Sequence, residues 1–492
     1  MSFFPSKNSF IEQAKYGNIW PVFLEIPFIP PFDAFLQIYQ NPCFFFDSAR
    51  GPHTIAKNSF IGVDPFMTAT LGKGLFESKE MPLIIQGNSF TTLKSLINKY
   101  AVKRHEGLPP FPGGLACLFN YDFVRYIEKI PKQARDDLSL SEAYFLFFDT
   151  VISFDMAQKR AWIQSCPGAK DTFLAGTVTE ADWRHYYDEA CLRIEKLRQQ
   201  IKYNRQAHPS RLSSQRQIVI NHEMDKRGYM DIVNRAKEYI RAGDIFQTNL
   251  SQRLTAQVDH VEPIAVYSLL RQINPSPFAA YMALGDLYIV SSSPERLVQV
   301  HNNGIVETRP IAGTRPRGVD IEGDKRMKAE LLLHPKERAE HIMLIDLERN
   351  DLGRISEYGS VFVNELMITE EYSHVIHIVS NIQGRLYKDK DCVDVIRAVF
   401  PGGTITGVPK VRCMEIIDEL EPVARGPYTG SLGYISFTGD MDLNIIIRTI
   451  VMKNSMAYAQ AGAGIVADSD PEREYYETLS KAEALIQTLK RL

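Results

Sequence analysis

The chain has 492 residues, of which 45% are hydrophobic and 23% charged, and its formal net charge is −3. This composition is typical of a globular protein with a substantial core, and the small net charge gives no support for binding of nucleic acid or another polyanion. Six cysteines lie apart without C-x-x-C or metal-type spacing, which suits a reducing cytosol. Because the N-terminus does not look like a secretory signal and no apolar run could span a bilayer, we expect a soluble, cytoplasmic protein.

Short apolar runs bounded by turn residues fill the start of the chain. Three runs rich in Phe, Val and Ile predict strands: residues 43–51, 58–65 and 143–155. Residues 111–129 begin at a Pro-Gly-Gly turn and are expected to run into a helix. The charged residues 180–201 have apolar positions at helical spacing, whereas 203–217 have none and predict a linker. The linker separates an N-terminal region, residues 1–205, from a C-terminal domain, residues 216–492.

A helix and a polar strand are expected after the linker. Residues 224–243 place apolar side chains near a helical period and end at a glycine that can stop the helix. Residues 244–254 read as a strand with polar side chains on one face, namely Gln247, Asn249 and Ser251. Such a face is either an exposed edge or the lining of a polar cavity, and this segment by itself favours exposure. Strands and helices mixed throughout favour an α+β or α/β fold with large sheets.

Two glycine-rich segments invite nucleotide-binding interpretations that they do not support. Residues 461–468 (AGAGIVAD) fit only G-x-G-x-x-A, and an Asp-Ser-Asp-Pro turn follows where a dinucleotide-binding fold needs a helix. Residues 401–410 (PGGTITGVPK) lack the Gly-Lys-Ser/Thr ending of a phosphate loop. Thr404 and Thr406 followed by Pro409 still predict a helix N-terminus, whose free N–H groups can hold a carboxylate or a phosphate.

Glu474, Glu477 and Lys481 are spaced three and then four residues apart, so a helix would put them on one face. Two neighbouring carboxylates repel unless a cation lies between them, and Mg²⁺ is suited to that position. The alternative is a solvated face with an ordinary Glu–Lys pair.

Three further residues each allow a structural and a functional interpretation. Glu295 follows a strand end bounded by proline, where it could transfer a proton or cap a turn. His377 lies in an apolar, strand-like run, where a histidine is more often structural. Arg448 lies in residues 443–451, which read as a nearly continuous apolar strand. A buried arginine there needs an anionic partner from the protein or from a substrate.

A series of motifs in chain order resembles those of the chorismate-utilising enzymes, the family of anthranilate synthase component I and aminodeoxychorismate synthase component I. The matching segments are SSSPER (291–296), RPIAGT (309–314), AEHIMLIDLERNDLGR (339–354), GGTITGVPK (402–410), GSLGYISFTGDMDLNIIIRT (430–449) and GAGIVADSDPEREYYET (462–478). The resemblance covers essentially the whole chain and is most specific from about residue 230 onwards. It implies one compact α/β (α+β) architecture with two large packed β-sheets flanked by helices, and a C-terminal domain that binds chorismate.

The resemblance implies a binding site for a dianion. The implied Mg²⁺ ligands are Glu340, Glu474 and Glu477, and the ion would bind the ring carboxylate of chorismate. Arg448 would bind the enolpyruvyl carboxylate, while Lys481 and the backbone around Gly464 would support the ring carboxylate. The metal and the cations would neutralise charges that otherwise oppose the reaction.

The resemblance also implies the groups that act at C4, where an allylic hydroxyl leaves. Glu295 would be the general acid/base at that departure, and His377 would lie beside the hydroxyl. The other members of the implied substrate pocket are Gln247, Asn249, Ala312, Gly313, Thr314, Thr404 and Tyr428.

Gln247 bears on the nucleophile. Relatives that add water to chorismate carry a lysine at this position, and a glutamine cannot act as a base, so ammonia is the expected nucleophile. A class I amidotransferase places its catalytic cysteine in a G-x-C-x-G turn, and none of the six cysteines has that setting. We therefore expect a separate glutaminase subunit to supply ammonia.

Local sequence separates the two ammonia-using branches only in part. Ala312 is the form usual in anthranilate synthases and leaves no lysine to attack the ring. Asn249, Arg296 and the segments IDLERND, PGGTITG and TGSLGY favour the aminodeoxychorismate branch. Phe45-Phe46-Asp47-Ser48 replaces the L-L-E-S segment of tryptophan-inhibited anthranilate synthases, which weighs against that inhibition.

We expect aminodeoxychorismate synthase component I, which would make 4-amino-4-deoxychorismate for 4-aminobenzoate and folate synthesis. The alternative is anthranilate synthase component I, which makes anthranilate and pyruvate for tryptophan synthesis. A non-catalytic regulatory or binding paralogue would have lost metal carboxylates or the acid/base pair, and this chain has lost neither.

Overall fold

The structure is a computed structural model that describes residues 2–52, 55–80, 85–86, 89–174, 182–202, 218–318, 320–371 and 375–492. The linker predicted at 203–217 lies outside the described residues. No helix in the described part of the chain is long and apolar enough to cross a membrane.

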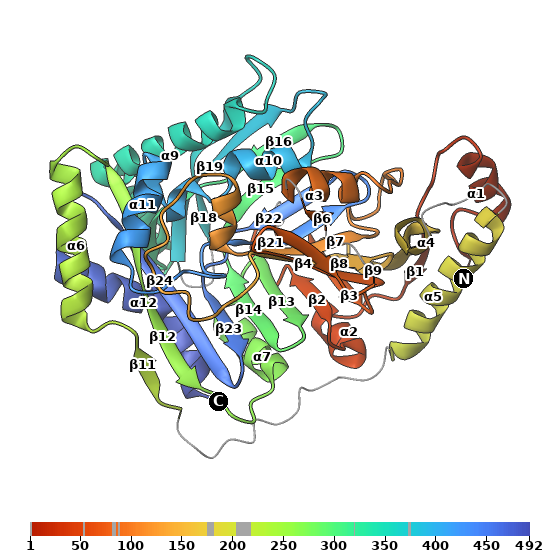
Figure 1. The fold of residues 1–492 in the computed structure, drawn as a ribbon, viewed down its shortest axis with the longest axis horizontal. Coiled ribbons are helices and arrows are strands. Elements are labelled where there is room, and N and C mark those ends of the chain that lie inside the picture. Colours follow the sequence, from red (N-terminus) through yellow and green to blue (C-terminus); the bar gives the residue numbers. More distant parts are fainter. Residues whose placement is uncertain are drawn as a thin grey trace.

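Two large antiparallel sheets of 12 strands each form the centre of the molecule (Figure 1). The first sheet, sheet A, contains in spatial order β1 (Val22–Ile26), β10 (Arg160–Ser165), β9 (Thr150–Asp155), β3 (Asn58–Val63), β2 (Cys43–Asp47), β13 (Phe278–Leu284), β14 (Leu287–Ser293), β23 (Thr449–Lys453), β24 (Met456–Ile465), β12 (Gln247–Gln257) and β11 (Ile220–His222), with β20 (Gly407–Val408) paired to β12. The second, sheet B, contains β17 (Ile311–Pro316), β19 (Val375–Arg385), β16 (Ile305–Thr308), β15 (Arg296–Val300), β22 (Met441–Asn444), β21 (Ser431–Ser436), β7 (Gly114–Phe119), β8 (Ala143–Phe148), β4 (Met67–Gly72), β5 (Leu75–Ser78) and β6 (Ile85–Gln86), with β18 (Phe362–Glu371) paired to β19. Each sheet takes strands from both sides of the predicted linker.

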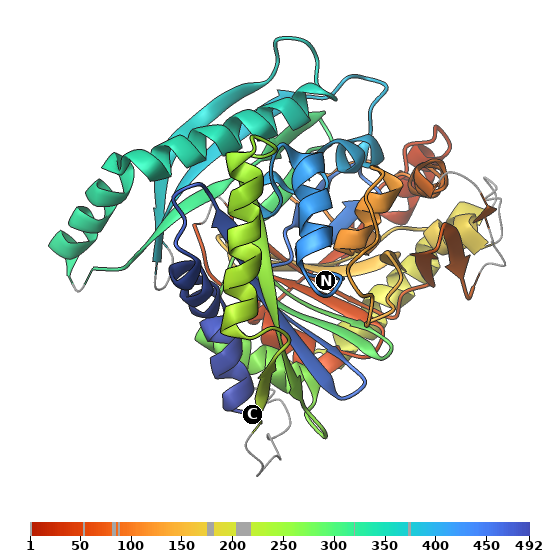
Figure 2. The ribbon, with the colours of Figure 1, turned by 60° about the vertical axis from the view of Figure 1, so that its left-hand side comes forward.

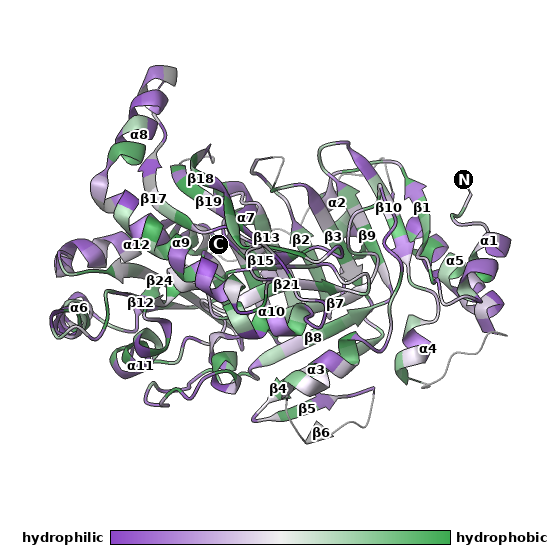
Figure 3. Ribbon diagram, turned by 90° about the horizontal axis from the view of Figure 1, so that it is seen from above, coloured by the Kyte–Doolittle hydropathy of each residue, from purple (hydrophilic) through white to green (hydrophobic). Residues whose placement is uncertain are grey.

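Helices surround the two sheets (Figure 1). They are α1 (Lys7–Ala14), α2 (Pro31–Ile38), α3 (Ser89–Ile97), α4 (Ala169–Leu174), α5 (Trp183–Gln200), α6 (Lys226–Arg241), α7 (Pro263–Ile273), α8 (Ile321–Leu333), α9 (Pro335–Gly353), α10 (Cys392–Val399), α11 (Lys410–Leu420) and α12 (Pro471–Lys490), with 3-10 turns η1 (Tyr121–Tyr126) and η3 (Gly403–Ile405). Figures 2 and 3 show α8 projecting from the body of the molecule, while α9 packs on β17 and β19. The predicted helices at 180–201 and 224–243 are confirmed as α5 and α6, and Gly243 ends α6 with φ +83°.

Apolar side chains fill a layer between the sheets and further layers beneath the helices. Successive side chains of strand β2 point to opposite faces of sheet A and so enter two different core layers. Phe44 packs between the sheets, and Phe45 packs beneath the helices with Phe32 and Phe35. Full burial of one such ring stabilises the fold by roughly 1.5–3 kcal/mol. Figure 3 shows the central strands as largely hydrophobic and the outer helices as more hydrophilic.

Two apolar runs that read as single strands are each divided between the sheets. Residues 143–155 form β8 in sheet B and β9 in sheet A, with Asp149 at the change. The continuous strand predicted at 443–451 is wrong in the same way, because β22 belongs to sheet B and β23 to sheet A. Arg448 lies in the crossover between them with φ +53°. Alternation of apolar residues cannot reveal such a change of sheet, since both sheets bury the strand.

Two other local predictions need correction. The helix expected within 111–129 is mostly the strand β7, followed by the short turn η1, because both neighbours β8 and β21 pair with this segment. The exposed edge favoured for 244–254 is wrong, because β12 pairs with β24 on one side and with β11 and β20 on the other. Gln247 and Ser251 are accordingly only 5% and 1% exposed.

Candidate active site

The site begins at the paired strands β12 and β24. Asn249 lies opposite Gly464 in the register of these strands. A Cβ atom on Gly464 would lie 2.7 Å from Nε2 of Gln247, so glycine is the residue that leaves room for this side chain. A Cβ atom on Gly462 would lie 2.4 Å from Oδ1 of Asn249 and 2.9 Å from the Tyr428 hydroxyl. The glycines of AGAGIVAD therefore make space for polar side chains.

Acidic residues from two helices flank β24. Proline at the first position of α9 favours the helix start, and Glu340 follows in the second turn. Its Oε1 accepts a hydrogen bond of 2.8 Å from Nε2 of Gln247. On α12, Glu477 lies 2.8 Å from Nζ of Lys481, which also donates to the carbonyl of Gly462 at 3.2 Å. Glu474 lies one turn earlier and is 9% exposed.

These carboxylates match Mg²⁺ in donor type, since the ion prefers hard oxygen ligands. Their arrangement does not form a complete metal site, because no group of three or more His, Cys, Asp or Glu side chains among the described residues is placed to hold an ion. Glu340 instead accepts a hydrogen bond from the Gln247 amide, and Glu477 forms an ion pair with the Lys481 ammonium. Glu477 and Lys481, which the sequence predicted to share one face of a helix, thus form an ion pair on α12 beside the polar side chains of the site.

Glu295 lies in the crossover from β14 in sheet A to β15 in sheet B. Its backbone carbonyl accepts from Ile445 N–H at 3.0 Å, so this crossover is bonded to the one that carries Arg448. Burial raises the pKa of the Glu295 carboxyl to about 7, against the lowering effects of Thr404, the Ile311 N–H and the Lys481 charge. The Thr404 hydroxyl is close to the carboxyl without reaching good hydrogen-bonding geometry. Glu295 is therefore poised to exchange a proton near neutral pH.

His377 and the residues 312–314 meet across β17 and β19. Nδ1 of His377 lies 3.2 Å from the carbonyl of Gly313, and burial lowers the pKa of the imidazole to about 4. The ring is therefore neutral at pH 7 and donates from Nδ1, which leaves Nε2 as an acceptor. Thr314 pairs with His377 and Ala312 with Ile378, with a bulge at Gly313 between them. Gly313 has φ +62°, and a Cβ there would lie 2.8 Å from Oε2 of Glu337, so the bulge requires glycine.

Arg448 has the environment of an anion receptor. Its Nη1 donates to the carbonyl of Lys481 at 2.5 Å, and no carboxylate of a described residue lies within 4 Å of the guanidinium. Burial lowers its pKa, partly offset by the nearby Tyr428 and Glu477. The Arg448 charge in turn contributes to the lowered pKa of His377. The crossover thus places an incompletely compensated cation beside Tyr428, Glu477 and His377.

Several buried polar atoms at the site have no partner in the described structure. They are Oε1 of Gln247, Oδ1 of Asn249, Oε1 of Glu295 and Oγ1 of Thr404. Because an unsatisfied buried polar atom costs about 1–3 kcal/mol, each of these atoms is a candidate contact for a polar ligand. The atoms come from separate segments, and each belongs to a residue that the sequence had placed in the pocket.

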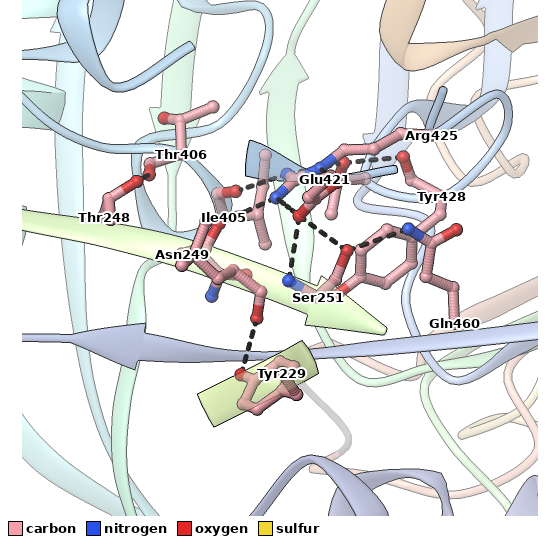
Figure 4. Close-up of polar contacts among 12 residues, drawn as sticks. Tyr229, Thr248, Asn249, Ser251, Ile405, Thr406, Glu421, Arg425, Tyr428 and Gln460 are labelled. Atoms are coloured by element: carbon pink, nitrogen blue, oxygen red, sulfur yellow. Dashed lines mark hydrogen bonds and ion pairs between the residues drawn. The ribbon is translucent and has the colours of Figure 1, made fainter. Parts of the chain in front are cut away.

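The sequence reasoning missed the buried pair Glu421 and Arg425 beneath the site (Figure 4). Arg425 donates to the carbonyls of Asn249 and Ile405, and Glu421 accepts from Ser251. The available signal was a Glu and an Arg four residues apart in EPVARGPY, next to the motif that supplied Tyr428.

A cavity of about 790 Å³ lies elsewhere and is lined by residues of both sheets. It includes Phe46, Asp47 and Ser48 of the segment compared with L-L-E-S, and none of the predicted site residues lines it. Asp47 is turned toward Arg271, with 2.5 Å between Oδ2 and Nε. This cavity is distinct from the site that contains Glu295 and Arg448.

Comparison with known proteins identifies the family of the chain. The family model described as chorismate binding enzyme matches residues 41–487. Anthranilate synthase component 1 of Acetivibrio thermocellus is 41% identical over 99% of this chain and 99% of its own length. Aminodeoxychorismate synthase component 1 of Bacillus subtilis is 40% identical over 96% of this chain and 97% of its own length.

A solved structure supports the architecture. The crystal structure of anthranilate synthase component I from Streptococcus pneumoniae is 35% identical and superposes with a TM-score of 0.74, covering 87% of this chain and 91% of that one. The arrangement of two antiparallel sheets flanked by helices predicted from the motifs is thus confirmed. The chain belongs to the chorismate-binding enzymes and is a chorismate-utilising enzyme of the anthranilate and aminodeoxychorismate synthase type.

Proposed function

We propose that the chain is component I of aminodeoxychorismate synthase, which replaces the C4 hydroxyl of chorismate by an amino group from ammonia. The observation that carries this proposal is the combination of four buried polar atoms without a partner and a partly buried arginine, Arg448, that pairs with no carboxylate of the described residues. Chorismate brings two carboxylates, a ring hydroxyl and an enolpyruvyl ether. A ligand of that kind would satisfy Arg448 and the open acceptor and donor atoms together.

The proposed chemistry requires proton donation to the hydroxyl that leaves from C4. Glu295 is the proposed donor, because its raised pKa keeps a large share of its carboxyl protonated at neutral pH. The C4–O bond breaks and the hydroxyl departs as water, while ammonia forms the new C–N bond either at C2 first or directly at C4. The neutral His377 lies near Arg448 and would accept a hydrogen bond through Nε2.

The proposed position of ammonia is the polar face of β12. The unpartnered oxygens of Gln247 and Asn249 are acceptors, and ammonia is a hydrogen-bond donor. Gln247 cannot take a proton from water, which favours amination over hydration. Both related proteins are named component 1, in keeping with a partner subunit, and a class I glutaminase is the proposed source of ammonia.

Magnesium is part of the proposal, with Glu340, Glu474 and Glu477 as the residues that would hold it. When bound, the ion would neutralise a substrate carboxylate. Titration calorimetry with Mg²⁺, with and without chorismate, tests this independently of turnover. Absence of any Mg²⁺ binding in both titrations would overturn it.

Anthranilate synthase component I is the second candidate. Ala312, which is 8% exposed on β17, has the form usual in that branch, and a relative of that name is as similar as the aminodeoxychorismate relative. The two candidates differ in product, because anthranilate formation also eliminates pyruvate in the same site.

The deciding experiment uses the purified chain with chorismate, ammonium and Mg²⁺, with and without an aminodeoxychorismate lyase. We expect 4-amino-4-deoxychorismate as the main product, converted to 4-aminobenzoate only when the lyase is added. Fluorescent anthranilate and pyruvate without lyase would contradict the assignment and establish the second candidate.

A further inference from the structure

The ion pair of Glu421 and Arg425 is almost completely buried beneath the site. The two side chains are 2% and 1% exposed, and two hydrogen bonds of 2.9 and 2.7 Å join them in a bidentate arrangement. Replacement of a buried pair by apolar residues is often neutral or stabilising, so stability alone does not account for such a pair. Its other contacts indicate what it does.

Arg425 bonds to two separate segments of the chain, the strand β12 and the turn η3 (Figure 4). Nη2 donates to the carbonyl of Asn249 at 2.7 Å, and Nη1 donates to the carbonyl of Ile405 at 2.9 Å. Asn249 carries the amide proposed to meet ammonia, and Ile405 follows Thr404, which lies beside Glu295. The backbone bond of 2.9 Å from Asn249 N–H to the Thr406 carbonyl joins the same two segments, and the planar guanidinium adds two further donors that fix their separation.

The Glu421–Arg425 pair also contacts the neighbouring strand and the turn that contains Tyr428. The Arg425 guanidinium lies over the ring of Tyr428, 5.6 Å from the centroid, and Nη1 is 3.2 Å from the Thr429 hydroxyl. Glu421 Oε1 accepts from the N–H and the hydroxyl of Ser251 at 2.8 and 2.7 Å. The Ser251 hydroxyl also accepts from Gln460 on β24 at 2.8 Å. These bonds hold β12, β24 and the Tyr428 turn in one network.

We propose that Arg425 is a positioning residue that sets the distance between the ammonia-binding face of β12 and the acid Glu295. The proposal rests on the proposed amination, because it assigns those two sides their roles. Arg425 does not touch substrate. It acts through the Asn249 and Ile405 backbones, and a point charge cannot replace its planar fork of donors.

The test is Arg425→Lys, assayed with chorismate and ammonium as separately varied substrates. We expect kcat to fall by about 10-fold or more, since a misplacement of about 1 Å can cost about 100-fold. We expect KM for ammonium to rise and KM for chorismate to change by less than about 3-fold, because Arg448 and Lys481 keep their places. An unchanged kcat per folded molecule would overturn the proposal.

Ser251→Ala gives a milder variant that keeps the ion pair and removes one hydroxyl of the network. It is expected to fold as the wild type does and to show a smaller fall in kcat in the same direction. Wild-type values for both kcat and the ammonium KM would contradict the network. Arg271→Lys is the matched control, because Arg271 pairs with the buried Asp47 away from the site. It should lower thermal stability and leave kcat unchanged.

The same assays separate this proposal from the proposed function. If the wild type converts chorismate to anthranilate, the assignment of product fails, while the kcat ratio of Arg425→Lys to wild type still tests the positioning role. If the wild type makes 4-amino-4-deoxychorismate and Arg425→Lys is as fast, the positioning role alone fails.

Discussion

Two arginines in the C-terminal part of the chain, the buried Arg425 and the partly buried Arg448, have opposite surroundings. Arg425 is paired with Glu421 and also donates to two carbonyls, and these partners raise its pKa above the ordinary value. Arg448 donates to one carbonyl and has no described carboxylate within 4 Å, so burial lowers its pKa. This difference in partners is the reason for proposing that Arg448 binds an anionic ligand and that Arg425 does not.

The backbones of the two regions explain how this difference arises. Arg425 lies four residues after Glu421 in the non-helical segment that follows α11, so its partner comes from the same segment. Arg448 lies at φ +53° in a crossover between sheets, where its segment contributes no acid to pair with it. The segment around Arg425 therefore supplies its own carboxylate partner, whereas the segment around Arg448 does not.

The largest expected effect separates the two arginines directly. Arg448→Gln should reduce kcat/KM by about 30- to 4,000-fold, because loss of a buried charge partner costs about 2–5 kcal/mol, while stability is unchanged or raised. Arg425→Gln should instead lower the free energy of unfolding by about 3–5 kcal/mol, since it leaves Glu421 buried and unpaired. Denaturant unfolding and steady-state kinetics on both variants measure this contrast. Equal losses of stability in the two variants would contradict the proposed difference between Arg448 and Arg425.

A second prediction extends the contrast to the carboxylates. Glu340→Ala or Glu477→Ala should lower Mg²⁺-dependent activity by about 100-fold or more while the protein stays folded, because the proposed role of these groups is to hold the ion. Calorimetric Mg²⁺ affinity and circular dichroism measure the two parts of the claim. Full turnover by the Glu477→Ala protein at ordinary Mg²⁺ would reduce the cluster to the Glu477–Lys481 surface pair.

A third prediction concerns Glu295, which has an unpartnered oxygen, in contrast to the fully bonded Glu421. Its pKa is raised to about 7, so the protonated donor is lost as pH rises through 7. We expect kcat/KM to fall by about tenfold per pH unit above that point. Glu295→Gln should be slow at every pH and lack this limb. A profile that keeps the same limb in Glu295→Gln would assign it to another group.

The pKa of Glu295 also has a consequence for stability. The folded protein keeps this proton between pH 4.5 and about 7, where the unfolded chain has lost it, so this group makes stability fall as pH rises through that window. Compared with the wild type, Glu295→Gln should show a smaller loss of melting temperature between pH 5 and 7.5.

The smallest effect is expected from glutamine. The purified chain should use ammonium, and glutamine should support no turnover, because none of its cysteines lies in a glutaminase-type turn. The unpartnered oxygens of Gln247 and Asn249 would receive ammonia made elsewhere. Product formed from glutamine by the chain alone, with ammonium removed enzymatically, would contradict a separate glutaminase.

The motifs predicted which residues belong to the candidate site, but they could not predict which of them hydrogen-bond to one another. Residue spacing placed Glu474, Glu477 and Lys481 on one helix face, and α12 has that face. The hydrogen bond between Gln247 and Glu340 joins a strand to a helix 93 residues away, which no local pattern indicates. Asn249 Oδ1 and Glu295 Oε1 have no hydrogen-bond partner in the described structure. Local sequence could not predict this, because it depends on how distant segments pack around these atoms.

The sequence by itself determined the family, the order of the motifs and most helices, because these depend on residue type and on spacing within one segment. Only the tertiary structure decided where the chain changes sheets, since an apolar run looks the same whichever sheet buries it. Those changes matter most at Glu295 and Arg448, which lie in two crossovers joined by the bond from Ile445 N–H to the Glu295 carbonyl. The burial of β12 was also decided by the tertiary structure, because neighbouring strands pair with both of its edges and Gln247 on its polar face contacts Glu340 of α9.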